Sequence, residues 1–430
     1  MFFQLCCQLW FVMSSTVVSL TSSFRFHGSN CRYLLKKFIC VTTVEVCDAR
    51  NDDSSTFAGY KNSNNFKPNS QNSIQNKISV TMSYKVNAIC LKVLSVLSFL
   101  LLLQPVNAQY NWAAIDTKLQ ANQKLLGNDV VAMIWKGDSL IYKKEMGDFN
   151  SKTQAPIASC SKWLTAALVM QFVDEGKISL NDPVVKYLPY FEKYFKSYIT
   201  IRQCLSHTTG IDDEGSLLKK LMQRKKFTTL EEEVESFAAR DIRANAGTDF
   251  WYGNIGLNIA GRVLEVISKK KFDILIKTKL FTPLGMRKTS FSNQEGAINP
   301  SGGAISTADD YMKFLVMLMN KGKNNGVQVL TEKSVNEMMK VQTNALPIKY
   351  APKSASGFNY AAGSWAIEEN KNGVATCLAS PGLFGTWPMI DFCRGYAYIV
   401  FVKSLLGEER AGVHLEIKKL IDKQTPSVCK

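Results

Sequence analysis

The chain has 430 residues, of which 46% are hydrophobic and 20% are charged, as in an ordinary globular protein. This length exceeds what one small core needs, so we expect a two-lobed domain or two domains. The formal net charge is +16, which could indicate an anionic partner. The lysines are scattered and often close to acidic residues, however, as between Lys219 and Glu235. This argues against a nucleic-acid partner and predicts a lysine-rich surface exposed to solvent.

Two hydrophobic segments, residues 1–20 and 88–106, precede the globular part, with a stretch rich in Asn, Ser and charge between them. We predict that residues 1–81 form a disordered N-terminal extension. Residues 82–108 have lysines before an apolar run and small residues before Gln109, which predicts a signal peptide or a membrane anchor. Residues 109–430 are then a secreted or extracytoplasmic domain, attached to the membrane if the segment stays uncleaved.

Beyond Gln109 the chain has five cysteines, and no two of them have metal-ligand spacing. With three histidines in the whole chain, we expect no metal site and no cofactor. In an oxidising compartment Cys377 and Cys393 could form a disulfide between neighbouring strands; the alternative is that they stay free. Cys160 is expected to be a small buried residue.

The first half of the domain opens with helical spacing over residues 116–126, which stops at Gly127. Residues 130–135 and 140–144 flank a turn and predict a β-hairpin. A mostly apolar helix follows and ends at Gly176. Helical patterns then predominate over about 177–345, including residues 229–240, 257–268, 309–320 and 331–340.

The β pattern returns in the last part of the chain, before an amphipathic helix over residues 408–422. The predicted strands are residues 361–367, 375–378, 386–390 and 396–402. This order suggests one mixed sheet whose two halves are separated in sequence by a helical lobe. A cleft between such lobes is a common place for a small-molecule site.

Ser159 and Lys162 stand at the start of the apolar helix that ends at Gly176. We place Ser159 at the helix cap, where free N–H groups and the helix dipole favour developing negative charge. Lys162 lies on the same face one turn later, beside an apolar wall, where it can act as a base toward the hydroxyl. The spacing alone is weak evidence, since Ser268 and Lys271 repeat it. The apolar helix that follows favours a catalytic role for the first pair.

Tyr252 and Asn254 flank a glycine just before a second apolar helix. The phenol could relay protons and the amide could orient a substrate carbonyl or the lysine. The alternative is that Tyr252 is a core or rim aromatic residue.

The segment Ser206-His207-Thr208-Thr209-Gly210 could hold a Ser-His pair, but we favour a helix end that Gly210 stops, with His207 as a hydrogen-bonded structural residue. The chain has no Gly-x-Ser-x-Gly sequence, which argues against an α/β-hydrolase nucleophile.

Residues 380–387 read Ser-Pro-Gly-Leu-Phe-Gly-Thr-Trp. Glycines allow a backbone to pass close to a ligand at a strand edge, so this segment could supply a second oxyanion donor. A plain β-turn is the alternative.

Together these segments resemble the serine hydrolases of the class C β-lactamase, D-alanyl-D-alanine carboxypeptidase and esterase family. The resemblance rests on motifs that occur in the family's order after Gln109. They are Ile157-Ala158-Ser159-Cys160-Ser161-Lys162, Leu180-Asn181-Asp182-Pro183-Val184, Leu205-Ser206-His207-Thr208-Thr209-Gly210-Ile211, Tyr252-Gly253-Asn254, Pro283-Leu284-Gly285-Met286 and Ser301-Gly302-Gly303-Ala304-Ile305-Ser306-Thr307.

The resemblance implies an α+β, β-lactamase/transpeptidase-like fold, with an antiparallel sheet flanked by helices and an all-helical lobe. It also implies acyl transfer through an ester on Ser159, with Lys162 and Tyr252 sharing the proton. Asn254 would then position the lysine and the substrate. The backbone N–H groups of Ser159 and Leu383 would form the oxyanion hole, and Ser380 and Gly382 would line the substrate site.

One position departs from the family pattern. The third motif commonly begins with Lys or His, whereas this chain has Ser380 before Pro381 and Gly382. The cation that would hold a substrate carboxylate is absent there, so a small ester or amide becomes the better substrate prediction. The alternatives are a penicillin-recognising D,D-peptidase or β-lactamase, and an inactive binding protein that keeps the fold.

Overall fold

The computed structural model describes residues 110–213, 226–291, 296–404 and 411–429. They belong to one compact unit, Val106–Lys430. The predicted N-terminal extension and the signal or anchor segment lie outside the described residues. Within the described part, no helix is long and apolar enough to cross a membrane.

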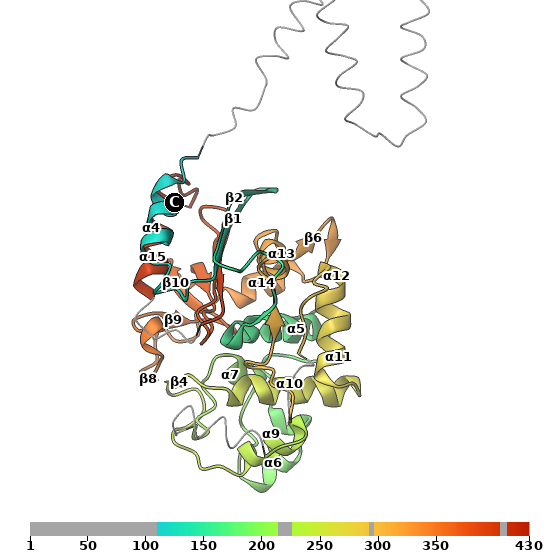
Figure 1. The fold of residues 1–430 in the computed structure, drawn as a ribbon. Helices are drawn as coiled ribbons and strands as arrows, with labels where there is room; N and C mark the ends of the chain where they lie inside the picture. The colour runs from blue at the N-terminus through green and yellow to red at the C-terminus, as the bar shows by residue number, and fades with distance from the viewer. Residues whose placement is uncertain (1–109, 214–225, 292–295, 405–410, 430) are drawn as a thin grey trace, which may run out of the picture. The chain divides into compact units, whose positions relative to one another are not determined.

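A seven-stranded sheet forms the centre of the unit (Figure 1), in the order β2-β1-β13-β12-β11-β10-β9. Every pairing in it is antiparallel. The strands are β1 (Val130–Lys136), β2 (Ser139–Met146), β9 (Asn359–Tyr360), β10 (Trp365–Glu369), β11 (Ala375–Ala379), β12 (Trp387–Asp391) and β13 (Tyr396–Val402). The hairpin from the start of the domain pairs with the last strand, so both halves form one sheet, as predicted. The antiparallel sheet that the family resemblance implied is confirmed, whereas the mixed sheet suggested by the order of elements was wrong, because most consecutive strands are joined by short turns that reverse the chain.

Both faces of the sheet are covered, which explains why all seven residues of β13 are buried. Its alternate side chains face opposite layers. Tyr398 and Val400 pack with the terminal helices α4 (Ala113–Ala121) and α15 (Ala411–Asp422), whereas Ile399 and Phe401 belong to the larger core on the other face. In Figure 1, α4 and α15 lie together on one side of the sheet, with α13 and α5 on the other. The opening helix begins three residues before the predicted start and ends at Ala121.

Helix α5 (Ser161–Asp174) lies at the centre of the larger core, and twelve of its residues, from Ser161 to Phe172, are buried. Helix α13 (Ala308–Met319) packs against β13, β12 and β1. The other described helices of the region between the two halves of the sheet are α6 (Tyr190–Lys193), α7 (Ile201–Leu205), α9 (Leu230–Ala238), α10 (Ile255–Ser268), α11 (Phe272–Ile276), α12 (Thr282–Leu284) and α14 (Glu332–Met338), with a π-helical turn at Lys277–Phe281 and short 3-10 turns.

Short strands join the segments around α5. The strand β3 (Ala155–Pro156) pairs with β5 (Ile305–Ser306), and β4 (Phe250–Trp251) pairs in parallel with β8 (Ile348–Tyr350). The hairpin β6–β7 joins Lys323–Asn324 to Val327–Gln328. These pairings bring the segments before Ser159 and before Tyr252 into fixed positions.

The disulfide differs from the prediction. Cys393 is bonded to Cys429, whereas Cys377 is free and buried. Cys377 on β11 is opposite Asp391, so Cys393 lies two residues beyond the paired part of β12. There it meets the tail after α15, whose Val428 N–H donates to the Cys393 carbonyl at 2.8 Å. The buried position predicted for Cys160 is confirmed.

Candidate active site

Ser159 lies in a 3-10 turn, Ala158–Cys160, that leads directly into α5. The predicted cap position is therefore shifted, because Cys160 is the residue before α5 and no side chain caps the helix. Ala158 has φ +44°, a conformation that a residue with a Cβ rarely adopts. Such strain persists where the surroundings enforce it and is concentrated at functional sites. The half-buried Ser159 is held in a bent, strained entry to a buried helix.

The side chain of Lys162 is 1% exposed and lies among three oxygen atoms. Its Nζ is 3.2 Å from Ser159 Oγ, 3.1 Å from Asn254 Oδ1 and 3.0 Å from the Ser301 carbonyl oxygen. A neutral amine has two N–H donors and one lone pair. The two carbonyl oxygens can accept both donors, which leaves the lone pair for the Ser159 hydroxyl. An ammonium can donate to all three atoms, so the amine can take up and return a proton without moving.

Tyr252 and Asn254 reach this point from the junction of β4 and α10. A Cβ on Gly253 between them would lie 2.0 Å from Asp213 Oδ2, so a larger residue there would displace that carboxylate. The same carboxylate accepts from the Asn254 backbone N–H at 3.3 Å. Asp213 thus fixes the tight bend from which Tyr252 and Asn254 point toward Lys162.

The Tyr252 ring lies under the amine of Lys162, with Nζ 4.9 Å from the ring centroid. Burial raises the pKa of the Tyr252 phenol, and a side-chain hydrogen bond with Ser159 opposes that shift. The phenol is therefore protonated at neutral pH. Of the two groups beside Ser159, the amine is the better initial proton acceptor, and the phenol is placed to pass protons on.

His207 supports Tyr252 from behind and does not join Ser206 in a catalytic pair. Its ring centroid is 4.7 Å from that of Tyr252, and its Nε2 is 3.1 Å from Tyr360 Oη. Burial, and then the charge of Lys162, hold the pKa of His207 well below its usual range. The predicted structural role is confirmed. However, α7 ends at Leu205 and the left-handed turn falls at His207 (φ +58°), not first at Gly210.

The segment after β11 passes directly beside the Ser159 turn. A Cβ on Gly382 would lie 2.3 Å from the Ile157 carbonyl oxygen, so only glycine permits this approach. Ser380 is buried, and its hydroxyl is 3.3 Å from the carbonyl oxygens of both Ser159 and Gly363. The hydroxyl is turned toward the backbone, where it joins the Ser159 turn to the sheet.

The predicted oxyanion donors are the backbone N–H groups of Ser159 and Leu383. The Ser159 N–H lies in the 3-10 turn before α5, and Leu383 follows Gly382, whose own N–H donates to the Thr386 carbonyl at 2.8 Å. Leu383 is also 38% exposed, on the open side of the segment. The oxyanion hole formed by these two N–H groups stays a prediction.

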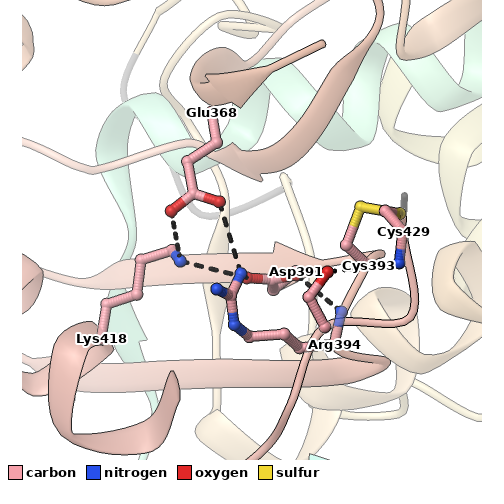
Figure 2. Close-up of a disulfide and its surroundings, with 7 residues drawn as sticks. Glu368, Asp391, Cys393, Arg394, Lys418 and Cys429 are labelled. Atoms are coloured by element: carbon pink, nitrogen blue, oxygen red, sulfur yellow. Dashed lines mark hydrogen bonds and ion pairs between the residues drawn. A yellow bond between two sulfur atoms is a disulfide. The ribbon is translucent and has the colours of Figure 1, made fainter. Parts of the chain in front are cut away.

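Within the described part of the chain, one group of carboxylates has the spacing of a metal site: Glu368, Asp391 and Asp422. A cation already occupies it. The Nζ of Lys418 lies 2.7, 3.0 and 2.7 Å from these three residues in that order. Figure 2 shows Lys418 and Arg394 beside Glu368 and Asp391, next to the Cys393–Cys429 disulfide. The cluster therefore ties α15 to the sheet and is no candidate for catalysis.

The family model described as Beta-lactamase matches residues 115–422, which is most of the chain and all of the site described above. The chain belongs to the beta-lactamase family. Its fold is the β-lactamase/transpeptidase-like fold that the sequence motifs implied, and members of this family are typically serine hydrolases.

Several known proteins are similar to this family member. An uncharacterized Mycobacterium tuberculosis protein is 24% identical over 358 residues, covering 66% of this chain and 87% of its own. A structure assigned as a beta-lactamase from Bacteroides dorei has 27% identity and a TM-score of 0.65, covering 73% of this chain and 99% of its own. EstCE1, a hydrolase with promiscuous acyltransferase activity, shares the fold at 18% identity and a TM-score of 0.60, covering 71% and 97%.

The sequence did not predict the residues that hold Lys162, Tyr252 and Asn254 in position. Asp213 shapes the Tyr252–Asn254 bend, and the Ser301 carbonyl accepts from Lys162. Asn258 donates to Glu233 and accepts from the Ser301 N–H. A signal for Asn258 was present: it is the one polar residue in the run Ile255–Gly261, and it lies one helical turn after Asn254 on the same face.

Proposed function

We propose that this beta-lactamase-family protein is a serine hydrolase that cleaves a small ester or amide through an acyl-serine intermediate. The observation that supports this most strongly is the position of the buried Lys162 amine, between the Ser159 hydroxyl and two carbonyl acceptors. That arrangement matches the chemistry of an activated hydroxyl nucleophile.

In acylation, the Ser159 hydroxyl oxygen attacks the substrate carbonyl carbon, and its proton passes to Lys162. The substrate oxygen becomes an oxyanion that receives hydrogen bonds from the N–H groups of Ser159 and Leu383, each worth about 3 kcal/mol at the transition state. When the carbonyl re-forms, the bond to the leaving group breaks. The proton then returns from Lys162 through the Tyr252 phenol to the departing oxygen or nitrogen.

In deacylation, a water molecule attacks the acyl carbon and its proton follows the same path in reverse. The phenol of Tyr252 hands a proton to Lys162 as it takes one from water, so neither step requires a free phenolate. The bond from the acyl carbon to Ser159 Oγ then breaks, the serine recovers its proton, and the acid is released. Asn254 keeps the amine in place throughout, and its amide N–H₂ remains available to a substrate carbonyl.

The segment after β11 supports the proposed substrate class. The side chain of Ser380 is buried and turned toward backbone carbonyls, so this position offers no cation to a substrate carboxylate. Penicillins and D-alanine-terminal peptides carry such a carboxylate. Gly382 lies against the Ile157 carbonyl beside the Ser159 turn, and the exposed apolar side chain of Leu383 next to it suits an uncharged acyl group.

We further propose that the domain works outside the cytoplasm, after cleavage before Gln109 or on a retained membrane anchor. The Cys393–Cys429 disulfide supports this location, since such bonds persist in oxidising compartments. N-terminal sequencing of the mature protein tests the proposal: a start at Gln109 indicates a cleaved signal, and an intact N-terminus in a cytoplasmic fraction contradicts export.

The activity is tested with a panel of short-chain esters and a chromogenic cephalosporin, using the wild type and Ser159→Ala. We expect ester hydrolysis that Ser159→Ala abolishes, and slow or no turnover of the cephalosporin. Cephalosporin turnover with inert esters would instead assign a penicillin-recognising enzyme. No turnover of either substrate and no covalent adduct would indicate a binding protein that keeps the fold.

A further inference from the structure

Lys162 has an acceptor that no side chain of the catalytic set provides, the backbone carbonyl of Ser301, at 3.0 Å from Nζ. Ser301 is fully buried and precedes β5. A backbone carbonyl can direct an amine only if the peptides around it are fixed. The contacts that fix Ser301 therefore matter to the orientation of the lysine lone pair.

Both peptides that flank Ser301 are held. The Pro300–Ser301 peptide accepts from Thr165 Oγ1 at 2.6 Å and donates its N–H to Asn258 Oδ1 at 3.0 Å. In the next peptide, the Gly302 N–H donates to the Asn299 carbonyl at 3.2 Å, while the Ser301 carbonyl faces Lys162. Asn258 on α10 provides the side-chain acceptor for the Ser301 N–H.

Asn258 itself is held in one orientation. Its side chain is fully buried on α10, and its Nδ2 donates to Glu233 Oε2 on α9 at 3.1 Å. Because a carboxylate accepts and does not donate, Glu233 fixes the amide nitrogen of Asn258 on its own side. The amide oxygen must then face the Ser301 N–H.

We propose that Asn258 and Glu233 are positioning residues for the general base. They form a chain of contacts, from the Glu233 carboxylate through the Asn258 amide to the Ser301 backbone and the Lys162 amine, that aims the amine's lone pair at the Ser159 hydroxyl. This inference rests on the proposed acyl-serine chemistry. It gives the helix α9 a role in catalysis without contact with the substrate.

The test is Asn258→Asp in the full chain, assayed by the rate of Ser159 acylation with a fluorophosphonate. The new carboxyl group would face Glu233 Oε2, where the two groups repel or share one proton. In both cases the amide donor that fixes the side chain is lost and the Ser301 peptide is free to shift. A displacement of about 1 Å can lower a rate by about 10²-fold. We expect a loss of that order in the maximal acylation rate, with no change in the half-saturating probe concentration. A defect in folding alone would lower the active fraction and leave the rate of the folded molecules unchanged.

The reciprocal double variant Asn258→Asp/Glu233→Gln restores one amide and one carboxylate with their bonds reversed. We expect it to recover most of the lost acylation rate. The control is Asn359→Asp, because Asn359 donates to Glu369 at 2.9 Å in an Asn–Glu pair on β9 and β10 that is exposed to solvent. It should acylate like the wild type.

If Asn258→Asp does not fold, Asn258→Ser removes both contacts with a smaller side chain and should show the same rate loss. A folded single variant that acylates at the wild-type rate, or a folded double variant that stays as slow as the single one, overturns the inference. If the wild type itself forms no adduct, the proposed acyl-serine function is wrong. A wild type that acylates normally together with unaffected variants rejects only the positioning role of Asn258 and Glu233.

Discussion

Replacing Lys162 by methionine should abolish most acylation without unfolding the protein. The substitution keeps the apolar stem and removes the amine, so the Ser301 carbonyl loses a donor in a fully buried position. A buried group left unpaired costs about 1–3 kcal/mol of unfolding free energy. Loss of the base should lower the acylation rate by about 10²–10⁴-fold. Lys162→Arg keeps the charge but cannot give up a proton, so it should be equally slow.

The assay is fluorophosphonate labelling of folded protein, with urea unfolding measured in parallel. Lys418→Met is the matched control. Lys418 is also a buried lysine, but it forms ion pairs with the three carboxylates of the cluster beside the disulfide. It should lower the unfolding free energy and leave the acylation rate of folded protein unchanged. If folded Lys162→Met acylates within a few-fold of the wild type, the lysine is not the base.

Three further predictions concern the surroundings of the site. The pKa of His207 is lower in the folded protein than in the unfolded chain, so neutral His207 stabilises the fold fully above about pH 6.5. This contribution to the unfolding free energy is lost as the pH falls toward the folded pKa. His207→Asn, which suits the left-handed conformation, should therefore lower the Tm less in acid than at neutral pH. Replacing Cys393 and Cys429 by serine should destabilise the fold by about 4 kcal/mol for a separation of 36 residues, with acylation of folded protein retained. Gly253→Ala should slow acylation strongly, whereas Gly412→Ala, with open space around it on α15, should not; equal rates for both glycine variants would contradict the account of the Tyr252–Asn254 bend.

The sequence was sufficient for the parts of the fold that local patterns encode. The turn residues between the segments 130–135 and 140–144 predicted the hairpin, and the apolar run after Ser159 predicted α5. It also predicted that Ser159, Lys162 and Asn254 would meet, through the order of the family's motifs. The disulfide was missed because Cys429 lies in a tail without any pattern, and its pairing depends on where α15 ends against the sheet.

The supporting residues of the site could not be derived from spacing. Asp213 lies in a loop and Glu233 on an amphipathic helix, and each looks like an ordinary surface acid until the tertiary structure buries it. The strained φ of Ala158 had no sequence signal, because alanine usually marks regular structure. Such features arise from contacts between segments that are far apart in the chain.

The most direct test of the central claim is intact-mass measurement after incubation with a fluorophosphonate, with the adduct mapped by peptide sequencing. We predict one adduct, on Ser159, in the wild type. Ser161→Ala should carry the same adduct, because the Ser161 hydroxyl accepts from the Ala304 N–H in the core and takes no part in acylation. Ser159→Ala should carry none. An unlabelled wild type, or equal labelling of Ser159→Ala, would contradict the assignment of Ser159 as the nucleophile.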